Sequence, residues 1–331
     1  MSLPRALAVL SLITVAACAP AGPDTADVNA HTVALFPDDP GRRGLGALQY
    51  AGGLALSGGG DRFGGWSAME VSADGARLLA ISDNGAWITA DLEYDRNGDL
   101  AGLTVPALAP MLDEDGAPLS GERADAEGLA HLGGGRYAVS FEREHRIAVY
   151  DIGPDWSAIE TARPEPFPAP PGADRLRANA GAEALVRLDT SLLVGIEDPI
   201  MDGQPNTVWR YDLNRLGTPP QSADLALTPG FGLTGLTPDG DGGVIVVERF
   251  WAREVGNRIR IGRIPPRALD ASGGPVTPEP VAAFDPSMTV DNFEAVALAR
   301  RSGERRLYLL SDDNFNDAQR TLLLSFIWPE D

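Results

Sequence analysis

Residues 124–151 read Ala-Asp-Ala-Glu-Gly-Leu-Ala-His-Leu-Gly-Gly-Gly-Arg-Tyr-Ala-Val-Ser-Phe-Glu-Arg-Glu-His-Arg-Ile-Ala-Val-Tyr-Asp. A short segment that begins at Glu127 is followed by two apolar runs, 136–141 and 146–150, and a glycine turn and a polar turn separate the three. Runs of this length between turn residues are typical of β-strands and too short for helices. The stretch therefore predicts three antiparallel strands, with Glu127 at the start of the first and Glu142 at the end of the second.

The same unit recurs along the whole chain. In each copy a polar residue stands before an apolar strand, a turn and a second strand, and a third strand follows; most copies add a weaker fourth. Repeats of four strands every 40–60 residues or so are the signature of a β-propeller. Because no amphipathic helix is found, we predict an all-β propeller of five four-stranded blades, with a sixth, degenerate blade in 101–122 or 154–178 as the alternative. The polar residues that mark the five units, 51 to 60 residues apart, are Ser67, Glu127, Glu183, Thr234 and Glu294.

The fifth unit stops at its third strand, because the sequence ends at Asp331. An apolar segment at residues 45–56 lies just before the first unit and has no place within it. An unpaired outer strand would leave an exposed sheet edge. We therefore predict that the N-terminal segment completes the fifth blade and closes the ring, which gives a propeller domain over residues 45–331.

The N-terminus has the features of an export signal. Residues 1–17 combine a short positive start, an apolar run and small residues, and the run is too short to span a bilayer. Val15-Ala-Ala-Cys18 resembles a bacterial lipobox, which predicts lipidation of Cys18; an ordinary secretory peptide is the alternative. Ala19 in place of aspartate favours the outer membrane, on its periplasmic side. We expect residues 18–44 to form the lipidated cysteine and a flexible tether.

The charge balance excludes several classes of function. The chain has 47 acidic and 27 basic residues, a formal net charge of −20 and no lysine, so Schiff-base chemistry is excluded. Nucleic acid and anionic membrane surfaces are not expected partners, because both attract basic proteins. We expect a monomer that contacts the membrane only through its lipid. Acidity suits cation binding, although it also keeps an exported protein soluble.

Acidic residues also end the second strands of the five units. In a propeller these positions adjoin the starts of the first strands, so all of them converge on one rim of the central channel. Crowded carboxylates repel one another unless they are protonated, pair with arginine or bind a cation. Oxygen ligands favour Ca²⁺ over Zn²⁺, whereas the alternative is that each acid satisfies turn amides. The predicted ligands are Ser67, Asp83, Glu127, Glu142, Glu183, Glu197, Glu248, Glu294 and Asp312.

Two of these acids and two arginines are candidates for catalysis. Glu127 and Glu183 would bind the metal or accept a proton, and Arg146 and Arg249 would hold a phosphate. The alternative for the arginines is ion pairing with the rim acids. His145 is either a general base or a surface loop residue.

These motifs resemble the phytase-like family, described as the esterase-like activity of phytase. The resemblance covers roughly residues 45–328 and implies a propeller with phosphoester hydrolase activity on a small-molecule substrate. A non-catalytic propeller that binds a ligand or an envelope protein, and a lactone or carboxylic-ester hydrolase, remain open. The similar segments are Phe63-Gly-Gly-Trp-Ser-Ala-Met, Ser82-Asp-Asn-Gly, Asp125-Ala-Glu-Gly-Leu, Ser140-Phe-Glu, Asn179 with Glu183-Ala-Leu, Asp291-Asn-Phe-Glu294, Ser311-Asp-Asp-Asn-Phe and Gln319-Arg-Thr.

Overall fold

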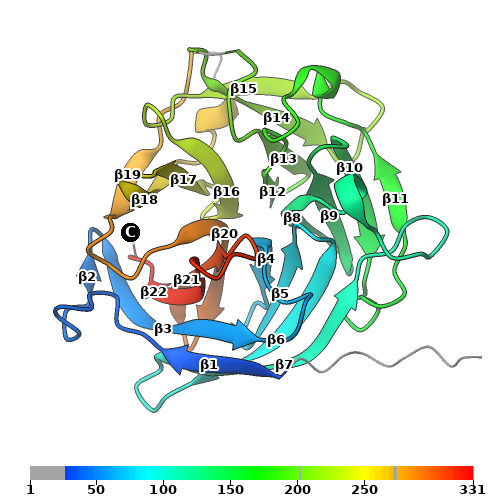
Figure 1. Cartoon of the computed structure of the whole chain (residues 1–331). Coiled ribbons are helices and arrows are strands. Elements are labelled where there is room, and N and C mark those ends of the chain that lie inside the picture. Colours follow the sequence, from blue (N-terminus) through cyan, green and yellow to red (C-terminus); the bar gives the residue numbers. More distant parts are fainter. Residues whose placement is uncertain (1–26, 202, 271–273, 331) are drawn as a thin grey trace, which may run out of the picture.

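The computed structural model describes residues 27–201, 203–270 and 274–330. Its strands form five four-stranded antiparallel sheets around a central channel, two of which are joined into a larger sheet of ten strands (Figure 1). The all-β propeller that the sequence predicts is confirmed. Three single 3₁₀ turns are the only helical elements among these residues. The sheets, from the channel outward, are β4 (Trp66–Val71), β5 (Arg77–Ser82), β6 (Ala86–Tyr94) and β7 (Leu100–Pro110); β8 (Ala126–Gly133), β9 (Arg136–Phe141), β10 (Arg146–Asp151) and β11 (Pro164–Phe167); β12 (Ala184–Leu188), β13 (Ser191–Gly195), β14 (Asn206–Asp212) and β15 (Gln221–Leu225); β16 (Gly232–Pro238), β17 (Val244–Ala252), β18 (Gly256–Ile264) and β19 (Glu279–Phe284); and β20 (Asn292–Arg301), β21 (Glu304–Asp312), β22 (Thr321–Ile327) and β3 (Leu48–Gly58).

We number these sheets as blades 1 to 5 in the order just given. The fifth blade contains both ends of the domain, since β3 pairs antiparallel with β22. The predicted closure by an N-terminal strand is therefore confirmed. β3 also touches β7 of blade 1 at one parallel pair, Gly52 with Leu100. Gly52 has φ 94°, and a Cβ there would lie 2.4 Å from the carbonyl oxygen of Leu100, so the two backbones meet at a contact that only glycine allows.

Residues before the propeller are more ordered than the predicted tether. β1 (Val28–Thr32) pairs antiparallel with the far side of β3, and the short β2 (Gly44–Leu45) pairs with its start. Leu35 and Phe36 are buried in the core between blades 4 and 5, and the hydroxyl of Thr289 donates to the carbonyl of Ala34 at 2.6 Å. The tether prediction is thus wrong for residues 27–44, because an apolar segment there packs on the domain. The predicted signal and Cys18 lie outside the described residues.

Each blade packs on both neighbours, which explains why the second strands are apolar throughout. In β5, Leu78 and Ala80 face blade 5, whereas Leu79 and Ile81 face blade 2. Successive strand residues point to opposite faces, and here both faces are buried. No helix among the described residues is both long and apolar enough to cross a membrane. Because the faces of the sheets are buried against one another, the polar residues available for a function lie at the strand ends, at the two mouths of the channel.

Candidate functional site

The first strand of four blades is irregular at the polar residue that marks its unit. Backbone pairing skips Ser67, Glu127, Thr234 and Glu294, each of which is an extra residue opposite the second strand. In blade 3, Glu183 directly precedes β12. A bulge redirects a side chain and is common next to active sites. All five residues stand at or just before the start of a first strand, so they share one mouth of the central channel.

The neighbouring position on the second strand carries an acid in four blades. The backbone amides of Asp83, Glu142 and Glu197 donate to carbonyl oxygens just before the first strand of their blade, those of Gly65, Asp125 and Gly181, at 2.9, 2.8 and 3.2 Å. Asp312 has the equivalent pairing with Asn292. These residues and the bulged acids therefore share one rim, as predicted.

In blade 4 this position is occupied by an arginine, Arg249. Gly232 pairs with Arg249, and Glu248 is one residue earlier, opposite Leu233. The carboxylate of Glu248 accepts a hydrogen bond from the amide of Thr228 at 2.7 Å, which fixes the loop before β16. The prediction of Glu248 as a rim ligand is wrong, because the register of β17 places Arg249 there instead.

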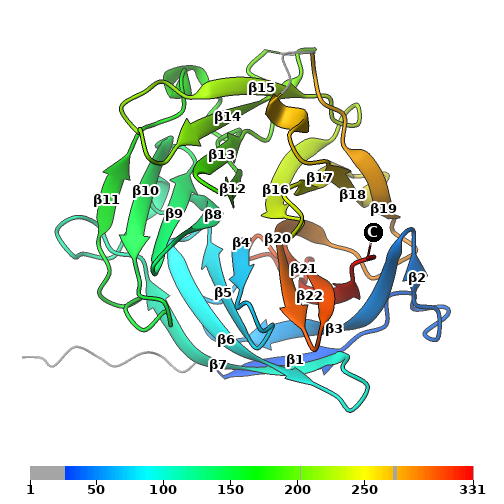
Figure 2. The same cartoon turned by 180° about the vertical axis from the view of Figure 1, so that it is seen from behind.

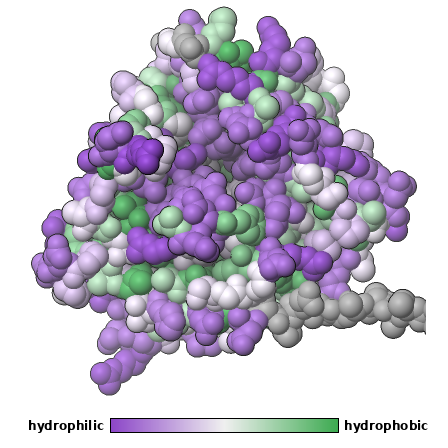
Figure 3. All heavy atoms as spheres, viewed as in Figure 1, coloured by the Kyte–Doolittle hydropathy of each residue, from purple (hydrophilic) through white to green (hydrophobic). Residues whose placement is uncertain are grey.

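The acidic rim, as we call this cluster, holds its carboxyl groups in surroundings that disfavour charge. Burial first, and neighbouring carboxylates second, raise the pKa of Asp83 to about 7 and that of Glu127 well above its ordinary value. Burial also raises the pKa of Glu142 to about 7 and that of Asp312 to about 6. Figure 3 shows the surrounding face as largely hydrophilic. The members of the rim are Asp83, Asp125, Glu127, Glu142, Glu183, Glu197, Glu294 and Asp312.

Arg249 neutralises one half of the acidic rim. Its Nη2 lies 2.8 Å from Glu197 Oε1 and 3.5 Å from Glu294 Oε1, and its Nη1 donates to Asn292 Oδ1 at 2.8 Å. Burial lowers its pKa, but Glu294, Glu197 and Glu183 raise it further, so the net shift is upward. The alternative role foreseen for this arginine, pairing with the rim, is what the structure shows.

Three carboxylates make up much of the other half. One oxygen from each of Asp125, Glu127 and Glu142 lies within 4.8 Å of the other two, a spacing that could hold a metal ion. Glu142 Oε1 also accepts the amide of Gly181 at 2.8 Å, and Asp125 pairs with Arg143. An all-oxygen donor set suits Ca²⁺. Asp125 is not among the ligands predicted from the sequence, although its position two residues before Glu127 was the available signal.

A pocket of about 470 Å³ opens beside this trio. Arg143 stands at its wall in a left-handed conformation, φ 52°, which is uncommon outside glycine. Phe315, from the loop between β21 and β22, forms another part of the wall. The lining residues are Asp83, Asn84, Gly121, Glu122, Ala124, Asp125, Arg143 and Phe315.

Other predicted site residues have structural partners. Arg146 stacks on the ring of Phe141, 3.7 Å from its centroid, and donates to the carbonyl of Arg123, so its guanidinium is engaged away from the acidic rim. The buried hydroxyls of Ser67 and Thr234 lie 3.3 and 3.4 Å from backbone carbonyl oxygens.

His145 has a backbone partner as well. Its Nε2 lies 3.0 Å from the carbonyl oxygen of Arg177. That contact fits the loop reading of this histidine better than a role as general base.

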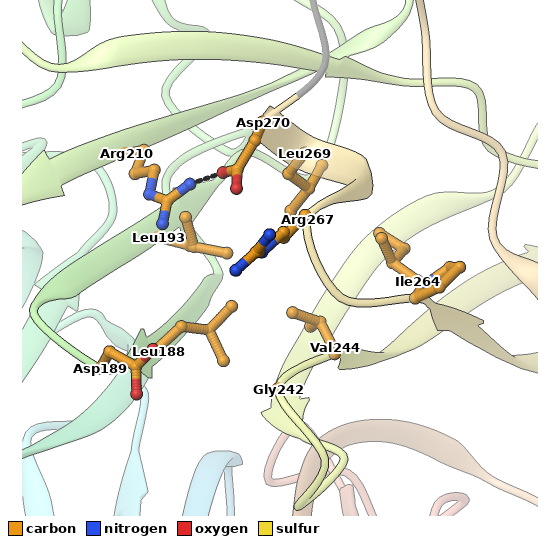
Figure 4. Close-up of a pocket in the computed structure, with 12 residues that line it drawn as sticks. Leu188, Asp189, Leu193, Arg210, Gly242, Val244, Ile264, Arg267, Leu269 and Asp270 are labelled. Carbon is orange, nitrogen blue, oxygen red and sulfur yellow. Dashed lines mark ion pairs between the residues drawn. The ribbon is translucent and has the colours of Figure 1, made fainter.

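Two further cavities lie at the opposite ends of the strands. Figure 2 shows the ring of strands from the side opposite to that of Figure 1. One, of about 190 Å³ between blades 3 and 4, has the Arg210–Asp270 ion pair on its wall and Arg267 projecting into it (Figure 4). The other, of about 360 Å³, is the second channel mouth, where Glu70 accepts the amide of His131 at 3.1 Å. Neither adjoins the acidic rim.

The fold and this rim define a β-propeller with a carboxylate cluster at one channel mouth. The chain belongs to the phytase-like family, described as the esterase-like activity of phytase, whose model matches residues 61–315. No curated protein matches the chain.

Solved structures with similar folds are remote in sequence. The chain is similar to the Dos1 propeller, at 13% identity and a TM-score of 0.36, over 75% of this chain and 53% of that one, so it spans about half of that structure. It is also similar to the RRP9 WD40 repeats, at 10% identity and a TM-score of 0.44, over 85% and 99% of the two chains. A third is the Myceliophteria thermophila Cps50 (Swd1) β-propeller domain, at 11% identity and a TM-score of 0.41, over 93% and 100%.

Proposed function

We propose that this protein is a calcium-dependent hydrolase of small ester substrates. The observation that carries the proposal is the trio Asp125, Glu127 and Glu142, of which Asp125 lines an open pocket, in a chain of the phytase-like family. The trio offers only oxygen donors, and burial and repulsion disfavour its full ionisation, so a divalent cation would relieve the cost of charging it. Hydrolysis of a phosphoester, expected from the sequence, stays one form of this activity.

Each residue of the site has a distinct role in this proposal. The bound cation would polarise an ester oxygen and offset negative charge. The amide of Gly181 holds Glu142, and Arg143 holds Asp125, so two of the three ligands are fixed by the chain itself. Asp83 lines the same pocket and would take a proton from the attacking water. The water oxygen forms a bond to the carbonyl carbon or the phosphorus atom of the ester. The bond from that atom to the alcohol oxygen breaks, and the alcohol leaves with the proton.

One cation suffices for this rim. The four carboxylates of the other half, Glu183, Glu197, Glu294 and Asp312, already interact with the guanidinium of Arg249. Arg249 therefore acts as a built-in counter-charge instead of a substrate ligand.

The test compares two substitutions of similar buried acids. Ester hydrolysis by the purified protein should require Ca²⁺, be lost with EDTA and be lost in Glu127→Gln. It should persist in Glu183→Gln, because Glu183 lies outside the trio. Activity that survives both EDTA and Glu127→Gln would overturn the proposal. Calcium binding without hydrolysis of any ester would instead favour the ligand-binding propeller.

We further propose that the protein is anchored by a lipid in the bacterial envelope, at the periplasmic side of the outer membrane. The support is the Val15-Ala-Ala-Cys18 tetrad after an apolar run. The test follows in the Discussion.

A further inference from the structure

Phe315 is a half-exposed aromatic residue held firmly at the acidic rim. Its side chain is 46% exposed, and both it and Asn314 have left-handed backbone angles, φ 48° and 49°. One carboxylate oxygen of Asp313 accepts the amides of Gly65 and Phe315, at 3.0 and 3.1 Å. Strained conformations that the surroundings enforce are concentrated at functional sites. The loop of blade 5 is thus fastened to blade 1 in a way that fixes this ring.

The Phe63-Gly-Gly-Trp motif makes room for the ring. A Cβ on Gly65 would lie 2.5 Å from Phe315 Cε2 and 2.1 Å from Asp83 Oδ1, and one on Gly64 would lie 3.1 Å from Phe315 Cε1. The edge of the aromatic ring therefore rests against two glycines, next to a rim carboxylate. This contact places Phe315 at the wall of the pocket that adjoins Asp125.

The charges of that pocket oppose an anionic substrate. Asp83, Glu122 and Asp125 line it, and its one cationic side chain, Arg143, already pairs with Asp125. A divalent cation on the trio, together with Arg143, would offset only part of the charge of the five acids Asp83, Glu122, Asp125, Glu127 and Glu142. Like charges repel strongly in a partly buried site, so a phosphate dianion is still disfavoured there. Phe315 and Ala124 supply an apolar wall instead. An uncharged ligand avoids repulsion by the carboxylates, and a flat apolar part of it can pack on the apolar wall. A ligand with both features therefore suits this pocket.

We propose that the pocket binds an uncharged carboxylic ester whose aromatic part packs on Phe315, and that Phe315 sets this specificity. The inference rests on the proposed function, whose site it extends. In the reaction, the water oxygen bonds to the carbonyl carbon, the bond from that carbon to the alcohol oxygen breaks, and the proton passes to the alcohol. Aromatic pairs gain energy beyond simple burial, so the aromatic part is favoured over an alkyl one.

Kinetics with calcium-loaded protein test the specificity. Wild type should hydrolyse phenyl acetate faster than ethyl acetate, and both faster than phenyl phosphate. Because phenolate is intrinsically the better leaving group, the effect of Phe315 is read from the change between wild type and variant: Phe315→Ala should lower kcat/KM for phenyl acetate about tenfold, mostly through KM, and lower that for ethyl acetate much less. Phe315→Tyr should retain most of the preference. Trp251→Ala, which removes a more exposed aromatic residue outside the pocket, should change neither substrate.

Binding separates this inference from the proposed function. Acetanilide, an uncharged amide analogue of phenyl acetate, and phenylphosphonate, an anion, are titrated by ligand-observed NMR, with melting curves to confirm folding. Acetanilide should bind wild type better than phenylphosphonate does, and about tenfold better than it binds Phe315→Ala. If acetanilide behaves so but no ester is hydrolysed, the pocket stands and the hydrolase proposal fails. Failure of acetanilide to bind, equal binding to Phe315→Ala, or a preference for phenylphosphonate overturns the inference.

Discussion

Arg249 Nη2 lies 2.8 Å from Glu197 Oε1, so a guanidinium from blade 4 neutralises a carboxylate from blade 3. The same group lies 3.5 Å from Glu294 of blade 5. One side chain therefore links three blades at the channel mouth. It also divides the acidic rim into a half that Arg249 neutralises and a half outside its reach, where Asp125 pairs with Arg143 instead.

Removal of this arginine should destabilise the propeller. Arg249→Met leaves Glu183, Glu197 and Glu294 without their shared cation, and loss of one partner of a partly buried ion pair costs roughly 3 kcal/mol. Urea unfolding at pH 7 measures the difference, and Arg253→Met, at an exposed site on the same hairpin, is the control. The deficit should shrink near pH 5, because burial already raises the pKa of Glu183 and of Glu294, and without Arg249 both carboxyls take up protons more readily. A deficit that does not depend on pH would show that packing, and not charge, is lost.

Calcium should stabilise the native protein through the trio alone. A cation that binds only the folded state adds about 2.7 kcal/mol at 100 times its dissociation constant, or a few degrees in Tm for a domain of this size. Melting curves with and without Ca²⁺ should show this shift in wild type and in Glu183→Gln, and no shift in Glu127→Gln. Loss of the shift in Glu183→Gln would mean that the cation binds on the Arg249 side.

Glu70 should make the protein less stable as the pH rises. Burial raises its pKa from 4.5 to about 7, so the folded state binds a proton that the unfolded state releases. Its contribution is complete below about pH 4.5 and is lost as the pH rises through about 7, at most about 3 kcal/mol. Glu70→Gln keeps an acceptor for the amide of His131 and should be more stable than wild type at pH 8 but equal at pH 4.5. Glu160→Gln, an exposed site, should match wild type throughout.

The contact that closes the ring can be tested with two glycines. Gly52 and Gly60 both have positive φ, but a Cβ on Gly52 meets the backbone of Leu100, whereas one on Gly60 meets nothing. Gly60→Ala should cost only the left-handed conformation, about 1–2 kcal/mol. Gly52→Ala should cost distinctly more and broaden thermal unfolding. Equal losses would show that blades 1 and 5 do not depend on this approach.

Membrane attachment should depend on Cys18. Cys18→Ser should move the protein from the membrane fraction to the soluble fraction of the envelope, or leave the precursor unprocessed. Fractionation and the mass of the mature N-terminus check this. Processing and membrane association unchanged from wild type would contradict the lipoprotein proposal.

The repeat in the sequence predicts the architecture because each unit is one sheet with its own turns. It also locates most of the acidic rim, since Glu127 and Glu294 are bulged residues at equivalent places. It fails at Glu248, because two polar residues adjoin in β17 and only the pairing of Gly232 with Arg249 decides which one reaches the rim.

The sequence did not predict contacts between segments that are far apart along the chain. Phe315 reaches the pocket only because Asp313 ties its loop to Gly65, nearly the whole domain away along the chain. Arginine is a residue type suited to binding phosphate, so the sequence favours that role for Arg146. Its position over the ring of Phe141, however, depends on packing within blade 2. The charge and spacing of residues in the sequence predict which of them lie close together. The partner that each one contacts depends on the fold.

The pairing of β3 with β22 also governs the order in which the protein can be completed. Synthesis produces residues 48–58 long before residues 321–327, so the first strand waits for nearly the entire domain before its partner is made. Contacts of such sequence separation form slowly, and until then both strands offer open edges to other chains. Premature termination anywhere before residue 321 would leave the ring open, so truncated products should aggregate or be degraded and not persist as smaller propellers.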